Sequence, residues 1–202
     1  MIEGRNIVKK FGSKVLFENL NFVIGDGEFV CFSGDSGSGK TTLLNIIGLI
    51  EPVDGGELLI NGKKYVSQRQ KQEYYRTKVG FLFQNFALIE NKTVRDNLEL
   101  IRKDTRTGHT IEEVLERVGL ADKIDSKIYT LSGGEQQRAA LARLYLKKCD
   151  IILADEPTGS LDRRNAQNVM RILTDLNDEG KTVVLVTHDE EIKNMADRMI
   201  AL

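Results

Sequence analysis

The chain has 202 residues, with 29 Lys or Arg against 30 Asp or Glu and a formal net charge of −1 at pH 7. This length suits a single domain, residues 1–202, with a full hydrophobic core. The balanced charge contains no long basic block, so we expect no nucleic-acid partner. No window approaches the roughly 20 apolar residues that span a bilayer, and the N-terminus lacks the apolar core of a signal peptide. We therefore expect a cytoplasmic protein.

The two cysteines, Cys31 and Cys149, each lie in or beside an apolar run and have no metal-ligand spacing. We interpret them as buried, reduced thiols, which agrees with a reducing compartment.

Four short apolar runs predict strands at 28–33, 79–83, 150–155 and 182–187. Three of these runs are nearly continuous in apolar residues, which is typical of strands covered on both faces. Amphipathic patterns lie between them. This alternation predicts an α/β domain with a mainly parallel sheet.

The segment GDSGSGKT at 34–41, called the phosphate loop below, follows the first of these strands and opens a predicted helix. Glycines let such a backbone curl until successive N–H groups converge on phosphate oxygens. Lys40 is placed to reach the β- and γ-phosphates, and the Thr41 hydroxyl to bind Mg²⁺. The expected phosphate-binding residues are Gly34, Asp35, Ser36, Gly37, Ser38, Gly39, Lys40, Thr41 and Thr42.

The region 86–147 is more charged, and no run within it predicts a strand. Because it lies between two buried strands, we expect a helical subdomain inserted into an α/β core of 1–85 and 148–202. Within it, Thr110 and Glu113 form a potential capping box, and Gly119 suits the position after the helix. The apolar residues at helical spacing there are Ile111, Val114, Leu115 and Val118.

The segment LSGGEQQR at 131–138, called the signature segment below, places two glycines at the start of a helix. Ser132 and Glu135 form a capping box, but this does not explain Gly133 and Gly134. Bare residues in a first helical turn leave N–H groups open to a ligand, and the helix dipole favours an anion. The residues alone leave open whether this second anion site meets the phosphate loop within one chain or across two.

The strand from Ile151 to Asp155 ends in two acids. In open α/β sheets, ligands bind at the carboxyl ends of strands, so Asp155 is placed to bind Mg²⁺. Glu156 is placed to take a proton from an attacking water. Asp162 is then the expected N-cap of another helix, which ends near Gly180.

Taken in this order, these segments resemble the nucleotide-binding subunits of ATP-binding cassette transporters. The signature segment matches a sequence that ordinary phosphate-loop proteins lack, and the similarity runs from Phe11 to His188. The resemblance implies a P-loop NTPase core with an antiparallel N-terminal β region and the inserted helical subdomain. It also implies an ATPase that uses ATP and Mg²⁺ and serves a separate membrane permease at the inner face of the cell membrane.

The same resemblance implies that two copies pair head to tail. ATP on the phosphate loop of one copy would be closed over by the signature helix of the other. The residues expected to contact that nucleotide from across the pair are Ser132, Gly133, Gly134, Glu135 and Asp162.

Further roles follow from position in the family pattern. Phe11 matches the aromatic residue that stacks on adenine, with a core Phe of the first strand pair as the alternative. Gln84 matches the glutamine that senses Mg²⁺ and the lytic water, and it begins the segment that touches the membrane subunit. His188 matches the switch histidine that contacts the γ-phosphate, and 160–162 match the loop that couples the two sites. The expected catalytic residues are Lys40, Gln84, Glu156 and His188, and the expected metal ligands are Thr41, Gln84 and Asp155.

The chain departs from the family pattern at a few positions. Asp35 adds a carboxylate to the phosphate loop, and we expect it to point outward. Tyr129 and Thr130 stand where many members have Pro-x-Glu, which affects contacts with partner subunits. The sequence ends at Leu202, shortly after His188, so we expect no regulatory C-terminal domain.

Three stretches, 43–63, 83–98 and 152–162, resemble subunits of macrolide-export, lipoprotein-release and bacteriocin-export systems. Residues 85–94 most resemble the peptide and bacteriocin exporters. A peptide, a drug or a lipoprotein is thus the expected kind of cargo. The alternative is a non-transport ATPase that signals through a membrane partner, as in the cell-division relatives. Nucleic-acid-acting relatives carry two cassettes or a long coiled coil, and this chain has neither.

Overall fold

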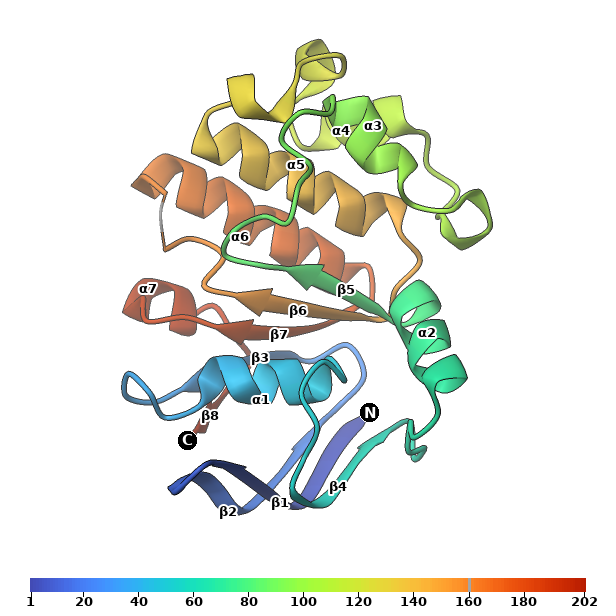
Figure 1. Cartoon of the computed structure of the whole chain (residues 1–202). Helices are drawn as coiled ribbons and strands as arrows, with labels where there is room; N and C mark the ends of the chain where they lie inside the picture. The colour runs from blue at the N-terminus through green and yellow to red at the C-terminus, as the bar shows by residue number, and fades with distance from the viewer. Residues whose placement is uncertain (160) are drawn as a thin grey trace.

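A five-stranded parallel sheet forms the centre of the computed structural model, which describes residues 1–159 and 161–202 (Figure 1). Its strand order is β5-β6-β7-β3-β8. The strands are β3 (Phe29–Ser33), β5 (Val79–Leu82), β6 (Ile151–Asp155), β7 (Thr182–Val186) and β8 (Arg198–Ala201). The four predicted strands are confirmed to within one residue at each end. The edge strand β8 was not predicted, because it is short and most of its residues are exposed.

A second, antiparallel sheet is built from three strands of the N-terminal region, as the family resemblance implied. Its order is β2-β1-β4, with β1 (Ile2–Phe11), β2 (Lys14–Ile24) and β4 (Gly55–Ile60). Strands β1 and β2 are joined at residues 12 and 13, where Gly12 has φ +58°. This tight turn places Phe11 directly opposite Lys14.

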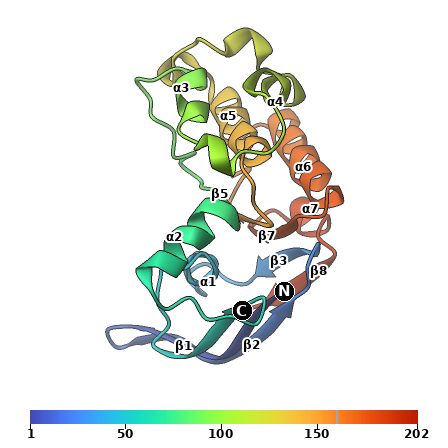
Figure 2. The same ribbon diagram turned by 90° about the vertical axis from the view of Figure 1, so that its right-hand side faces the viewer.

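The helices cover both faces of the parallel sheet. They are α1 (Lys40–Ile47), α2 (Gln68–Thr77), α3 (Val94–Glu99), α4 (Ile111–Arg117), α5 (Gly133–Leu146), α6 (Arg163–Asp178) and α7 (Glu190–Lys193), with 3₁₀ turns at Lys103–Thr105, Ala121–Lys123 and Ile128–Thr130. Figure 1 shows α5 and α6 on one side of the sheet, and α1 with the antiparallel sheet on the other. In Figure 2, α3, α4 and α5 gather at the end of the molecule away from the antiparallel sheet.

The two faces of the parallel sheet build two separate hydrophobic clusters. Along β3, Phe29 and Cys31 face the cluster that contains α5 and α6, whereas Val30 and Phe32 face the cluster that contains α1 and the antiparallel sheet. This alternation follows from the two-residue period of a strand. Because both faces are covered, the central strands are continuously apolar, as their sequences indicated.

The expected helix ends are confirmed by their capping geometry. The Thr110 hydroxyl accepts from the N–H of Glu113, the Asp162 carboxylate accepts from the N–H of Asn165, and Gly119 has φ +67°. Both cysteines are buried and unbridged, and burial raises the pKa of the Cys31 thiol to about 11. None of the helices in 1–159 and 161–202 is long and apolar enough to cross a bilayer.

Candidate functional site

The phosphate loop connects β3 to α1 and has the backbone that its glycines predict. Gly37 and Gly39 have φ +81° and +100°, a region that residues with a side chain avoid. A Cβ at Gly39 would lie 2.7 Å from the Phe17 ring, so this position also needs glycine for packing. Gly39 caps α1 without a side-chain hydrogen bond, which leaves the N–H groups of the first turn free for an anion.

Lys40 is the first residue of α1 and is only 5% exposed. Its Nζ donates to the carbonyl oxygens of Gly34 and Asp35, at 2.8 Å each. Since neither partner is a carboxylate, the positive charge of the ammonium is not neutralised. The Asp35 side chain is exposed and lies outside the cavity described below, as expected.

Thr41 and Asp155 meet at the carboxyl end of β6. The Thr41 hydroxyl donates to Asp155 Oδ1 at 3.0 Å. Burial raises the pKa of Asp155, while the Thr41 hydrogen bond and the charge of Lys40 act in the opposite direction. A partly buried carboxylate beside a hydroxyl is an oxygen donor set that fits Mg²⁺, which needs few protein ligands. Gln84 and Thr42 line the same cavity as Thr41, which is described below.

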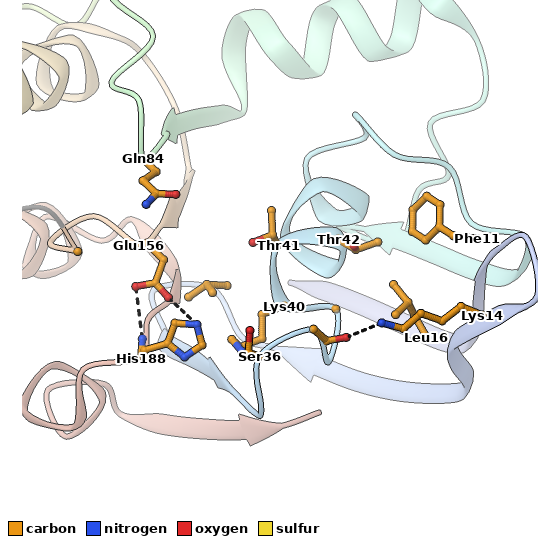
Figure 3. Close-up of a pocket in the computed structure, with 14 residues that line it drawn as sticks. Phe11, Lys14, Leu16, Ser36, Lys40, Thr41, Thr42, Gln84, Glu156 and His188 are labelled. Carbon is orange, nitrogen blue, oxygen red and sulfur yellow. Dashed lines mark hydrogen bonds and ion pairs between the residues drawn. The ribbon is translucent and has the colours of Figure 1, made fainter.

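Glu156 has φ +45°, an uncommon value for a residue with a side chain. Its N–H donates to the carbonyl oxygen of Val186, and this conformation turns its side chain toward His188 (Figure 3). His188 Nε2 lies 3.3 Å from Glu156 Oε1, and the His188 N–H donates to Oε2 at 3.4 Å. The Nε2 contact lacks hydrogen-bond geometry, so no group among the described residues donates to the buried Oε1.

Lys40, Thr41, Gln84, Glu156 and His188 line one elongated cavity of about 710 Å³, and Asp155 lies beside it through its hydrogen bond with Thr41. Phe11, which is 49% exposed, lies at one end, and Gln84, Glu156 and His188 lie at the other. The phosphate loop and the start of α1 lie between them (Figure 3). The structure therefore brings the expected catalytic and metal-binding residues to one place.

The cavity also contains residues that the sequence analysis missed, namely Lys14, Leu16, Gly159 and Val186. Lys14 Nζ donates to the Gly37 carbonyl oxygen at 3.4 Å, reaching over the phosphate loop. The only sequence feature that points to Lys14 is the Gly-Ser turn at 12–13, which places Lys14 opposite Phe11 in the strand pair. Without the register of β1 and β2, a single lysine at this position does not indicate a place in the cavity.

The signature segment begins α5 with the predicted capping box. The Ser132 hydroxyl accepts from the N–H of Glu135, and the Glu135 carboxylate accepts from the N–H of Ser132 at 2.8 Å. A Cβ at Gly133 would meet no atom within 4 Å, so this residue is open to a ligand. A Cβ at Gly134 would lie 2.7 Å from the Asn165 side chain, so Gly134 has a packing role that the sequence did not reveal.

The signature segment does not reach the first cavity within this chain. Ser132, Glu135 and Asp162 instead line a separate polar cavity of about 650 Å³, together with Arg138 and Asn165. Ser160, expected in the loop that couples the two sites, lies outside the described residues. The two helix starts that the sequence predicts to bind anions thus open into different cavities of one chain.

The segment after Gln84 is held in an unusual conformation. Phe86 and Ala87 have φ +59° and +47°. Arg143, on α5, donates to the carbonyl oxygens of both, with 2.6 Å to that of Ala87. Burial lowers the pKa of Arg143 to about 10, which leaves it charged at neutral pH. Helix α5 therefore fixes the segment that carries Gln84.

Proteins of a known family are similar to this chain in sequence and in fold. The family described as ABC transporter matches residues 17–159. The uncharacterized ABC transporter ATP-binding protein MJ1508 of Methanocaldococcus jannaschii is 39% identical, over 100% of this chain and 95% of that protein. The macrolide export ATP-binding/permease protein MacB of Chlorobaculum tepidum is 41% identical, over 100% of this chain and 33% of that protein. The chain therefore spans about a third of the length of the MacB relative.

Two solved structures of a similar cassette match the whole fold. The dimeric structure of MJ0796, a bacterial ABC transporter cassette, is 38% identical with a TM-score of 0.88, over 100% of this chain and 94% of that one. A dimeric post-hydrolysis state of the same cassette, bound to ADP and Pi, is 37% identical with a TM-score of 0.86 and the same coverage. The phosphate loop, the signature segment and these matches define the class: the chain belongs to the ABC transporter family, as an ATP-binding cassette.

Proposed function

We propose that this cassette binds and hydrolyses ATP and works as a head-to-tail pair that powers a membrane permease for export. The observation that carries the proposal is the order of groups along the 710 Å³ cavity. An aromatic ring lies at one end, the phosphate loop in the middle and a carboxylate at the other end. This order matches that of adenine, the phosphate chain and the water that attacks the γ-phosphate.

Lys40 and the first N–H groups of α1 neutralise the charge of the triphosphate. Phosphoryl transfer depends mainly on positioning and charge stabilisation, which fixed donors in a partly buried site supply. Thr41, Asp155 and Gln84 would hold Mg²⁺, which when bound neutralises charge on the phosphate oxygens. Phe11 stacks on adenine, for which its exposed ring is available.

Glu156 acts as the general base. Its side chain lines the 710 Å³ cavity, and its Oε1 has no hydrogen-bond donor within the described part of the chain, so the carboxylate keeps an acceptor for a water that enters the cavity. Removing a proton from that water increases its nucleophilicity toward the γ-phosphate. His188 contacts the same carboxylate and fixes its orientation, and Gln84 faces it across the cavity (Figure 3).

A second copy completes the site. Because the signature segment opens into a different cavity, its free N–H groups at Gly133 have no phosphate to bind within one chain. Head-to-tail pairing brings the signature segment of one copy onto the triphosphate held by the other. The dimeric MJ0796 cassettes support this arrangement.

The permease contact lies beside Gln84. A groove of about 380 Å³ there is lined by Phe83, Ala87, Leu100 and Arg143, and Leu100 is 61% exposed. A partner in this groove would touch the segment that Arg143 holds, and through it Gln84. Docking to a permease places the cassette at the inner face of the cell membrane, and the MacB relatives, which are named ATP-binding/permease proteins, support export as the task.

Replacement Glu156→Gln tests the proposal, with exposed Glu18→Gln as the matched control. We expect ATP hydrolysis to fall by about 100-fold or more, since general-base catalysis contributes 10²–10⁴-fold. ATP binding should remain, and ATP but not ADP should shift the variant to a dimer in size-exclusion chromatography. A Glu156→Gln variant that hydrolyses ATP at the wild-type rate would refute the assignment of the base.

A further inference from the structure

Lys9 is a buried cation that the mechanism above does not use. It is 3% exposed, although it lies on β1 in the antiparallel sheet. Its Nζ contacts Glu51 Oε1 at 2.7 Å, the Pro52 carbonyl oxygen at 2.9 Å and Asp54 Oδ2 at 3.6 Å. A buried lysine loses hydration and rotamer freedom, so these contacts have to compensate for its position.

The same ammonium lies 4.9 Å from the centre of the Phe11 ring. Lys9 and Phe11 are two residues apart on one strand, so their side chains share a face. Phe11 lines the proposed ATP cavity, and Lys9 does not. The cation therefore contacts the ring from the protein side and leaves the ring accessible from the cavity.

The position of Lys9 is itself fixed by the loop after α1. Asp54 accepts from the N–H of Lys10 at 2.7 Å, and the N–H of Asp54 donates to the carbonyl oxygen of Val8 at 2.9 Å. Contact with Glu51 raises the pKa of Lys9, which keeps it charged at neutral pH. This loop is the direct continuation of the helix that begins with Lys40.

We propose that Lys9 is a positioning residue for the nucleobase, which holds the Phe11 ring in place and draws electron density from its free face. A cation on one face of an aromatic ring is attracted to its π electrons. Polarising that density makes the other face a better stacking surface for an electron-rich purine such as adenine. The inference rests on the proposed stacking of adenine on Phe11, and goes beyond it by assigning a role to Lys9.

The test compares ATP with inorganic tripolyphosphate, which has the phosphates but no base, by isothermal titration calorimetry with Mg²⁺. Lys9→Met keeps the length of the side chain and removes its charge. We expect its Kd for ATP to rise about threefold to tenfold, the range that a partly desolvated cation–π contact supports, with no change in the Kd for tripolyphosphate. In steady-state assays, KM for ATP should rise while kcat stays the same, and Lys9→Arg should restore wild-type affinity.

The same measurement in a Phe11→Ala background separates positioning from general stability. If Lys9 acts through the ring, Lys9→Met has no further effect on ATP affinity there. If Lys9→Met weakens ATP by the same factor with and without Phe11, or weakens tripolyphosphate equally, the inference is wrong. If Lys9→Met fails to fold, Glu51→Gln, which releases the ammonium, should give the same dependence on Phe11 with a smaller effect.

The two proposals fail in different ways. If Phe11→Ala leaves the affinity for ATP unchanged, adenine does not stack on Phe11, and the inference falls with that part of the proposed function. If Phe11→Ala weakens ATP binding but Lys9→Met does not, only the role of Lys9 is refuted.

Discussion

Gly134 lies against the side chain of Asn165, where a Cβ would come within 2.7 Å of the Asn165 amide group. Asn165 is itself held from two directions, because Arg138 donates to its Oδ1 at 2.9 Å and its Nδ2 donates to Asp162 at 2.6 Å. The start of α5 is thereby joined to the start of α6. The two glycines of the signature segment thus serve different purposes, since Gly133 is open to solvent.

Substitutions at the two glycines should therefore have opposite consequences. Gly134→Ala collides with Asn165, and we expect it to lower the free energy of unfolding by about 1–3 kcal/mol, as overpacking does. Gly133→Ala meets no atom and gains helix propensity, so stability should stay equal or rise by up to about 1 kcal/mol. Chemical denaturation measures both. Equal destabilisation by the two variants would contradict the packing role of Gly134.

Lys40→Ala removes the cation that faces the triphosphate. We expect no measurable ATP binding by calorimetry and no turnover, because the phosphate loop carbonyls then lose their partner and the phosphates lose their charge. Lys148→Ala, at an exposed lysine just after the end of α5, is the control and should bind ATP normally. Normal affinity in Lys40→Ala would place the nucleotide elsewhere.

The raised pKa of Asp155 predicts that the free energy of unfolding depends on pH. Burial raises its pKa in the folded state above the unfolded value of about 3.9. The stability that it contributes is therefore complete below the unfolded pKa and is lost as the pH rises through the folded pKa. At pH 7, without nucleotide, the ionised carboxylate lowers stability.

Asp155→Asn should then raise the midpoint of thermal unfolding at pH 7, by an amount that shrinks as the pH falls toward 4. It keeps an acceptor for the Thr41 hydroxyl and removes the buried charge. Added Mg²⁺ and ATP should stabilise the wild type more than the variant. Exposed Asp178→Asn is the control, and a matching pH profile in the two variants would refute the effect of burial.

Arg143 should control the segment that carries Gln84. Arg143→Met removes the donors to the carbonyl oxygens of Phe86 and Ala87, whose left-handed conformations are otherwise unfavourable. We expect faster amide hydrogen exchange at 84–88 and a several-fold lower kcat, with little change in KM. Arg102→Met, at an exposed arginine of the same groove, should change neither. Unchanged exchange in Arg143→Met would contradict this role.

The central strands and the helix caps could be predicted because their signals are local. Ile151 to Ala154 are apolar because both faces of β6 are covered, and Asp162 caps the next helix through its immediate neighbours. The phosphate loop and Glu156 could be identified for the same reason, because the strands and the helix that give these residues their meaning lie directly beside them in the chain. The positions of their side chains in one cavity follow from the parallel sheet.

The relationships that could not be predicted join residues far apart in the sequence. Asn165 on α6 contacts Gly134 on α5. Arg143 donates to the carbonyl oxygen of Phe86, which is more than 50 residues away in the sequence. The partners of Lys9 come from a loop that only the folded sheet brings near it. Strand β8 was not predicted because it is a short edge strand in which only Ile200 is partly buried, so burial leaves little signal in its sequence.

Ser132→Arg tests whether the signature segment acts in its own chain or in a partner. The substitution puts a bulky cation at the helix start, outside the 710 Å³ cavity. We expect the isolated chain to bind ATP with wild-type affinity, while the ATP-dependent dimer of the Glu156→Gln background is lost. Loss of ATP binding by the monomer would instead place the signature segment in the site of its own chain.

The most direct measurement is a crystal structure of the Glu156→Gln variant grown with ATP and Mg²⁺. The account predicts that a γ-phosphate held by Lys40 of one copy lies within about 3 Å of the N–H groups at Gly133 and Gly134 of the partner subunit, the distance of a charge-assisted hydrogen bond. A structure in which residues 132–134 of both copies lie far from any nucleotide would contradict it.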